Sequence, residues 1–191
     1  MKARDSGMPV EETWNSFFDP FEVFQRLGLS DPEGLVVDFG SGYGTFLIPA
    51  ARQFPRSRIV GLDCEPEANT SCRDRIAQEG LSNATIVDRD LLADRSGLEP
   101  GSAKLVLLFN LLHAEDPVGL LTDAHRSLQT GGQVAVIHWN HDPATPRGPR
   151  MDIRPRPEQT LAWAAEAGFE VPPTVVPVAR YHYGFTACKH R

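Results

Sequence analysis

The sequence has few cysteines and no long apolar run, and these absences exclude several classes of protein. The three cysteines, Cys64, Cys72 and Cys188, are odd in number and unevenly spaced, so neither a disulfide framework nor a zinc site is indicated. No run approaches the roughly 20 apolar residues of a membrane-spanning helix. The first residues also lack the apolar segment of a signal peptide. We therefore expect a cytoplasmic protein without a membrane span and without a bound metal.

Positive charge is also in short supply. The chain has 19 Lys and Arg against 25 Asp and Glu, for a formal net charge of −6. An acidic chain is a poor electrostatic partner for nucleic acid unless a local basic patch overrides the total. The 191 residues, 41% of them hydrophobic, are enough to form one domain with its own core. We expect a single domain over residues 1–191 that does not bind nucleic acid; its oligomeric state is left open.

Apolar runs alternate with helical patterns through most of the chain, which predicts a parallel sheet covered by helices on both faces. The expected parallel strands are 34–39, 57–63, 84–90, 103–110 and 133–139. Helices are expected over 44–54, 65–80 and 115–132, with Pro49 kinking the first or marking an irregular turn and Gly131 stopping the third. The domain is thus expected to comprise an N-terminal helical segment (1–30), a core (35–139), an Arg- and Pro-rich loop (140–157), and a final helix with two strands (158–191).

A glycine-rich turn, "GSGYG" at residues 40–44, follows the first expected strand. Glycine is required where φ is positive, and it also lets a ligand approach the backbone closely. In an open parallel sheet, ligands bind beyond the carboxyl ends of the strands, where the strand order reverses. Asp63, Asp90 and Asn110 come at the ends of the next three strands, so they should meet the turn at that edge. A carboxylate at Asp63 suits ribose hydroxyls and one at Asp90 suits an adenine amine, which predicts an adenosine-sized pocket.

Each of these assignments has a structural alternative. The glycines could serve the turn alone, and Asp63 could cap the following helix. Asp88 and Asp94 are close enough to Asp90 to take its place. The spacing G-x-G-x-G puts Thr45 where a nicotinamide-binding loop has its third glycine, and no phosphate-binding Gly-Lys-Ser/Thr ending is present.

Five segments in order resemble the successive motifs of the class I S-adenosylmethionine-dependent methyltransferases. They are "VVDFGSGYGTF", "IVGLDCEPEA", "VDRDLL", the stretch from "AKLVLLFN" to "QVAVIHW", and the closing "YHYGFTACK". The resemblance covers about residues 35–188 and is to the small-molecule branch related to ubiquinone and menaquinone biosynthesis methyltransferases. It implies a doubly wound, Rossmann-like α/β sheet of seven strands, five parallel with a C-terminal antiparallel element. The chain departs from the pattern at Lys104, where many relatives have Asp, far from the expected pocket.

The resemblance also implies S-adenosyl-L-methionine as cofactor and gives roles to particular residues. Contact with the methionine part is implied for Asp38, Gly40, Ser41, Gly42, Tyr43 and Gly44. Asp63 would hold the ribose, Cys64 would lie against the adenine, Asp90 and Leu91 would hold the adenine amine and ring nitrogen, and Asn110 would line the methionine end.

Groups that could act on a methyl acceptor are less clearly marked. His113 and His138 lie at the expected edge and titrate near neutrality, but the first could cap a helix and the second could be buried in the sheet. Trp14, Arg150 and Tyr181 are candidate substrate contacts. Arg150 belongs to a loop with Arg147, Arg154 and Arg156, and arginine clusters suit a carboxylate or phosphate. That loop could equally be an irregular solvated segment, and the N-terminal aromatics could simply pack on the sheet.

The sequence therefore favours methyl transfer to a small-molecule acceptor. The dipeptide Leu111-Leu112 after Asn110 stands where a base-amine methyltransferase would have two prolines, which argues against a nucleic-acid substrate. Two alternatives of other classes stay open: a non-catalytic binding or scaffold protein with the same fold, and a nicotinamide-dependent oxidoreductase, which Thr45 and Asp38 disfavour.

Overall fold

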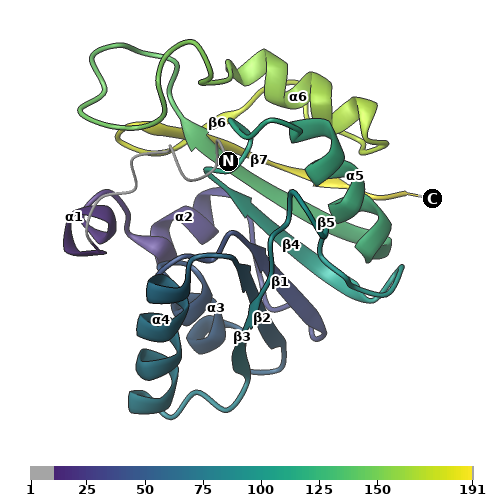
Figure 1. Ribbon diagram of the computed structural model, residues 1–191. Coiled ribbons are helices and arrows are strands. Elements are labelled where there is room, and N and C mark those ends of the chain that lie inside the picture. The colour runs from purple at the N-terminus through teal and green to yellow at the C-terminus, as the bar shows by residue number, and fades with distance from the viewer. Residues whose placement is uncertain (1–10, 191) are drawn as a thin grey trace.

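Seven strands form one mixed sheet in the computed structural model, which describes residues 11–190 (Figure 1). The strands are β1 (Leu35–Phe39), β2 (Arg58–Asp63), β3 (Ala84–Asp88), β4 (Ala103–Phe109), β5 (Leu128–Trp139), β6 (Val176–Ala179) and β7 (His182–Cys188). Their order is β3-β2-β1-β4-β5-β7-β6; β1 to β5 run parallel, whereas β7 runs antiparallel to both β5 and β6. The predicted seven-stranded doubly wound sheet is confirmed.

Six helices accompany the sheet in the described residues. They are α1 (Glu11–Asn15), α2 (Pro20–Arg26), α3 (Leu47–Gln53), α4 (Pro66–Gln78), α5 (Pro117–Ser127) and α6 (Pro157–Glu166). Four of them begin with proline, whose missing N–H is not needed at a helix start. None of these helices is long and apolar enough to cross a membrane. The first ten residues of the expected N-terminal segment lie outside the described part of the chain.

Two local expectations were wrong. Pro49 does not interrupt a helix, because α3 begins only at Leu47 and Pro49 therefore sits in its first turn. Gly131 does not end α5, which stops at Ser127. The chain is already extended at Leu128, which is buried and pairs with Ala103, and Gly131 (φ 78°) lies within β5 with its N–H donating to the Lys189 carbonyl at 2.7 Å.

The sheet separates two apolar cores, because successive side chains of a strand point to opposite faces. On one face Val36, Leu105 and Ile137 pack with α2 and α3. On the other face Val37 and Val106 pack with α5 and α6. Figure 1 shows the two groups of helices on either side of the sheet. Because the helices cover the two faces of the sheet, the loops that form the site lie at the carboxyl edge of the parallel strands.

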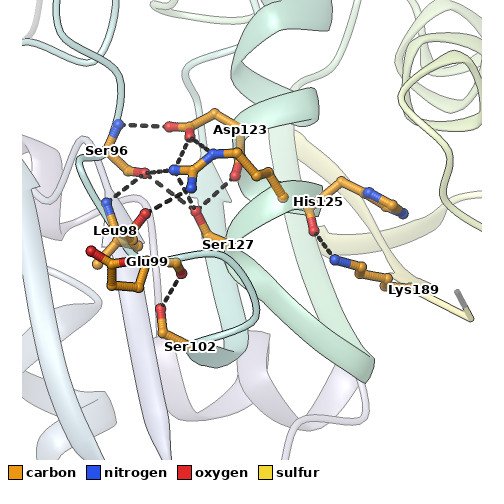
Figure 2. A network of polar contacts seen from close by, with 9 residues as sticks. Ser96, Leu98, Glu99, Ser102, Asp123, His125, Ser127 and Lys189 are labelled. Atoms are coloured by element: carbon orange, nitrogen blue, oxygen red, sulfur yellow. Dashed lines mark hydrogen bonds and ion pairs between the residues drawn. The ribbon is translucent and has the colours of Figure 1, made fainter.

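A polar network fastens the long connection between β3 and β4 to α5 (Figure 2). The buried carboxylate of Asp123 accepts from the Ser96 N–H at 2.6 Å and pairs with Arg126 at 2.8 Å. Arg126 also donates to the Leu98 carbonyl at 2.8 Å. At the end of the same helix the Lys189 ammonium donates to the carbonyls of His125 and Leu128, both at 2.7 Å. One buried carboxylate thereby satisfies a backbone N–H that has no water to bond.

We predict that Asp123→Ala lowers the free energy of unfolding by about 2–3 kcal/mol, because it leaves the buried Ser96 N–H without an acceptor. Glu22→Ala, which removes the exposed Glu22–Arg26 pair, serves as the control and should cost below about 1 kcal/mol. Urea denaturation followed by circular dichroism measures both. Equal losses in the two variants would contradict the assigned role of Asp123.

Candidate active site

A cavity of about 430 Å³ opens at the carboxyl ends of β1 and β4, where the sheet order switches direction. Residues at four strand ends contribute its walls: 38, 40–43, 45 and 46 at the end of β1, 62–65, 67 and 68 at that of β2, 89–92 at that of β3, and 109–111 and 113 at that of β4. Trp14, Trp139 and residues 147–149 complete the lining. The predicted meeting of the glycine turn with the strand ends is therefore present in the structure.

The three glycines of the turn have different surroundings. Gly40, Gly42 and Gly44 all have positive φ, at 73°, 51° and 81°, so turn geometry alone requires glycine. Gly40 and Gly42 also line the cavity, whereas Gly44 does not. A Cβ at Gly44 would collide with the Cys72 sulfur and press on Ile48. Gly44 thus allows close packing against α4 and does not lie at the position implied for cofactor contact.

The carboxylate of Asp63 ties the turn to the next helix. Its Oδ2 accepts from the Gly42 N–H and its Oδ1 from the Glu65 N–H, both at 2.8 Å. Burial raises the pKa of Asp63, although these bonds favour its ionised form. Asp63 therefore both shapes the cavity and lines it.

Several polar groups of the cavity wall have no partner within the described residues. Asp38 is only 2% exposed, and burial, with a contribution from the charge of Asp63, raises the pKa of its carboxyl to about 8. The Ser41 hydroxyl and both amide atoms of Asn110 are buried without a hydrogen bond. Buried polar groups normally have partners. A polar, positively charged ligand would supply them and would favour the ionised form of Asp38.

The end of β3 resolves the choice among neighbouring aspartates. Asp88 points to Asn69 and Arg73, at 2.7 and 2.8 Å. Asp90 lines the cavity, with Oδ1 accepting from the N–H groups of Leu92 and Ala93. Leu91 and Cys64 lie in the same wall, so the polar and apolar surfaces implied for an adenine are adjacent.

The opposite end of the cavity is aromatic and contains His113. Its Nδ1 lies 3.3 Å from the Nε2 of His138, and its buried Nε2 has no hydrogen-bond partner among residues 11–190. Burial lowers the pKa of His113 to about 4 and that of His138 well below its usual value. Both rings are neutral at pH 7. The two predicted histidines are thus in contact, but only His113 reaches the cavity.

The remaining substrate candidates differ in whether they line the cavity. Trp14 lines the cavity, whereas Arg150 and Tyr181 are not among the residues that do. Arg150 is exposed and pairs with Asp152 at 3.0 Å, and Tyr181 contacts Phe17 and Arg180. In the described chain, no group of three or more His, Cys, Asp or Glu side chains could hold a metal ion.

Sequence reasoning missed the role of Arg154. This side chain is 6% exposed, and its guanidinium donates to the carbonyls of Pro149, Asn140, Asp142 and Arg147 and to the Thr145 hydroxyl. It also lies 6.0 Å from the centre of the Trp139 ring. The loop predicted over residues 140–157 is therefore organised around the buried guanidinium of Arg154. The only sign of this in the sequence is an arginine between Ile153 and Pro155.

Comparison with known proteins places the chain in a class, the methyltransferases. A family model described as a methyltransferase domain matches residues 36–132, about half of the chain. The chain belongs to this family, and the family and cofactor implied by the resemblance, S-adenosylmethionine, are confirmed.

Among curated relatives, a ribosomal RNA small subunit methyltransferase C of Ectopseudomonas mendocina is 29% identical over 114 residues, which are 56% of this chain and 32% of that protein. A demethylmenaquinone methyltransferase of Bacteroides fragilis is 24% identical over 102 residues, 53% of this chain and 42% of that protein. The match thus spans between a third and a half of the length of these relatives.

Solved structures match over more of the chain. A SAM-dependent methyltransferase from Aquifex aeolicus superimposes with a TM-score of 0.80 at 20% identity, covering 97% of this chain and 96% of that one. Phosphoethanolamine N-methyltransferase 2 of Haemonchus contortus, solved with S-adenosyl-L-methionine, gives 0.74 at 16% identity, covering 93% and 53%. These similarities confirm the fold.

We predict that S-adenosylmethionine binds more tightly as the pH rises toward 8, because binding of a cation requires Asp38 to lose its proton. The dissociation constant should fall by up to about tenfold per pH unit below that value and then level off. Asp38→Asn should weaken binding more than about tenfold at pH 8.5 and abolish the pH dependence. Isothermal titration calorimetry between pH 6 and 9 measures both.

Thermal unfolding provides the control for this variant. The folded-state pKa of Asp38 lies above its usual value of 3.8, so its contribution to stability is present at low pH and is lost as the pH rises through about 8. The amide introduced by Asp38→Asn has no proton to lose in this range, so the ligand-free variant should melt no lower than the wild type at pH 9. A pH-independent affinity in the wild type would contradict the assignment.

Proposed function

We propose that this protein transfers a methyl group from S-adenosylmethionine to a small-molecule acceptor. The observation that supports this most directly is a single cavity with two chemically different ends. On the β1, β2 and β3 side lie the acids and the glycine turn. On the β4 and β5 side lie Asn110, His113, Trp139 and the 147–149 segment, with Trp14 against Trp139. Its volume lies within the roughly 300–1,000 Å³ of small-molecule sites.

The residues on the first side, together with Asn110, would each act on a different part of the cofactor, which supplies an electrophilic methyl group on a sulfonium. Ionised Asp38 would offset positive charge, and Gly40 and Gly42 would let the methionine part approach the backbone. Asp63 would accept from ribose hydroxyls with lone pairs that its two backbone bonds leave free. Asp90 would accept from the adenine amine, and the Asn110 amide would bind at the methionine end.

The histidines at the other end are weak bases. With a pKa of about 4, His113 is poorly matched to remove a proton near neutral pH. Its free Nε2 can still make one hydrogen bond to the acceptor. We therefore propose that most of the rate comes from holding an acceptor in line with the methyl group, and that this acceptor attacks through a lone pair or an atom that is already ionised.

A small acceptor is also favoured over RNA, although some relatives act on ribosomal RNA by name. The cavity lining contains five acids, Asp38, Asp63, Glu65, Glu67 and Asp90, against two arginines, Arg89 and Arg147. A nucleic-acid phosphate backbone binds to surfaces on which basic side chains outnumber acidic ones. We also propose a cytoplasmic setting, in which Cys64, Cys72 and Cys188, none of them in a disulfide within the described residues, would stay reduced.

Transfer of a labelled methyl group tests the proposal. Purified protein is incubated with methyl-labelled cofactor and either a small-molecule extract or total RNA. Label should enter the small-molecule fraction only, and Asp38→Asn should abolish it. Label in RNA would overturn the choice of acceptor. Tight cofactor binding without transfer to either fraction would favour the non-catalytic scaffold.

Once an acceptor is known, the wild type and His113→Gln should give pH–rate profiles of the same shape at saturating substrates. Because the pKa of His113 is near 4, its titration does not fall between pH 5.5 and 8. The variant should be slower by about tenfold at most, from loss of one hydrogen bond. A rate limb near pH 6.5 that disappears in His113→Gln would show that the ring acts as a base.

A further inference from the structure

We propose that the methyl acceptor carries a carboxylate that pairs with Arg147 at the aromatic end of the cavity. This inference rests on the proposed methyl transfer and specifies the class of its acceptor. The acceptor would combine an apolar, ring-containing body with one negative charge set apart from the atom that is methylated.

Arg147 is the available cation of the 140–157 loop. Of the four arginines there, it alone lines the cavity among the described residues. The Arg150 guanidinium pairs with Asp152, and that of Arg154 is occupied by loop carbonyls. The guanidinium of Arg147 has no hydrogen bond or ion pair within residues 11–190, and the side chain is exposed.

The backbone that carries Arg147 is held in place on both sides. The Arg154 guanidinium donates to the carbonyls of Arg147, at 3.2 Å, and of Pro149, at 2.7 Å. Between them Gly148, at φ 117°, lies so close to Trp139 that a Cβ there would come within 2.9 Å of the indole ring. A cation on a fixed backbone at the cavity rim loses less conformational entropy when a ligand binds.

The charges of the cavity favour a carboxylate over a phosphate. Arg89 follows β3 directly before Asp90, at the strand ends proposed to hold the cofactor, whereas Arg147 belongs to the 147–149 segment away from those acids. We therefore place the anion of the acceptor at Arg147. One guanidinium matches one carboxylate with two parallel hydrogen bonds. A phosphate dianion would face the same single arginine with an uncompensated second charge. Trp14 is partly exposed in the same cavity and packs against the buried Trp139, with ring centres 6.2 Å apart, so it offers flat apolar surface that suits an aromatic body.

Matched probes test this proposal on the protein loaded with S-adenosylhomocysteine. Benzoate, 2-naphthoate and indole-3-acetate are each titrated against their uncharged carboxamides, with tryptophan fluorescence and saturation-transfer NMR as readouts. At least one carboxylate should bind about fivefold or more tightly than its amide, as expected for a charge-assisted pair partly screened by water. Arg147→Gln should remove this preference, whereas Arg150→Gln, from the same loop but outside the cavity, should retain it.

The other outcomes overturn the proposal in distinguishable ways. No preference for any carboxylate, or a preference that survives in Arg147→Gln, removes Arg147 as the anchor. Phenyl phosphate binding more tightly than benzoate would replace the carboxylate with a phosphate. Weaker binding of S-adenosylhomocysteine by Arg147→Gln, at a melting temperature equal to that of the wild type, would assign the arginine to the cofactor. If the wild type does not bind S-adenosylhomocysteine, the proposed function itself fails before any probe is added.

Discussion

The carboxylate of Asp63 is the interaction on which the site depends. It stands at the end of β2, accepts from the backbone of the glycine turn after β1, and accepts again at the start of α4. The glycine turn after β1 is thereby fixed to the connection between β2 and α4, which lies 21 residues further along the chain. Asp63 holds the Gly42 N–H of this turn, and Arg75 holds its Tyr43 carbonyl at 3.0 Å. Because the Asp63 carboxylate bonds to the turn and lines the cavity, we expect its substitution to change the shape of the cavity as well as its chemistry.

The cavity holds polar groups whose burial opposes folding. Asp38 is buried, the Ser41 hydroxyl and the Asn110 amide are enclosed without partners in the described chain, and Asn110 also has a positive φ of 56°. Such costs are common where a structure is arranged in advance for a ligand. The two apolar cores on either side of the sheet, together with the Asp123 network, offset them. A bound ligand can then form the hydrogen bonds that the Ser41 hydroxyl and the Asn110 amide lack within the described chain.

Local patterns in the sequence were enough to predict the sheet, its helices and most of the cavity wall. The glycine turn, Asp63, Asp90 and Asn110 follow strand ends, and parallel strands bring such ends together. Contacts made only in three dimensions could not be predicted. The His113–His138 pair joins two strand ends, the Arg154 carbonyl cluster depends on how a proline-rich loop closes, and Gly44 faces Cys72 because of how α3 and α4 pack. The early start of β5 likewise reflects pairing of Leu128 with Ala103, and tertiary pairing overrides a glycine stop signal.

The position of β7 between β5 and β6 has a consequence for the order in which the sheet is assembled. The parallel part can form from sequential βαβ units. β2 and then β3 add on one side of β1, and β4 and then β5 add on its other side. β6 precedes β7 in the sequence but lies at the edge of the sheet, beyond β7. Among the described strands, β6 therefore pairs only with a strand that follows it in the chain. The two are joined by a tight turn, and β7 spans seven residue pairs with β5. We therefore expect the last two strands to dock as one hairpin, a step that closes the outer edge of the sheet and brings Lys189 to the end of α5.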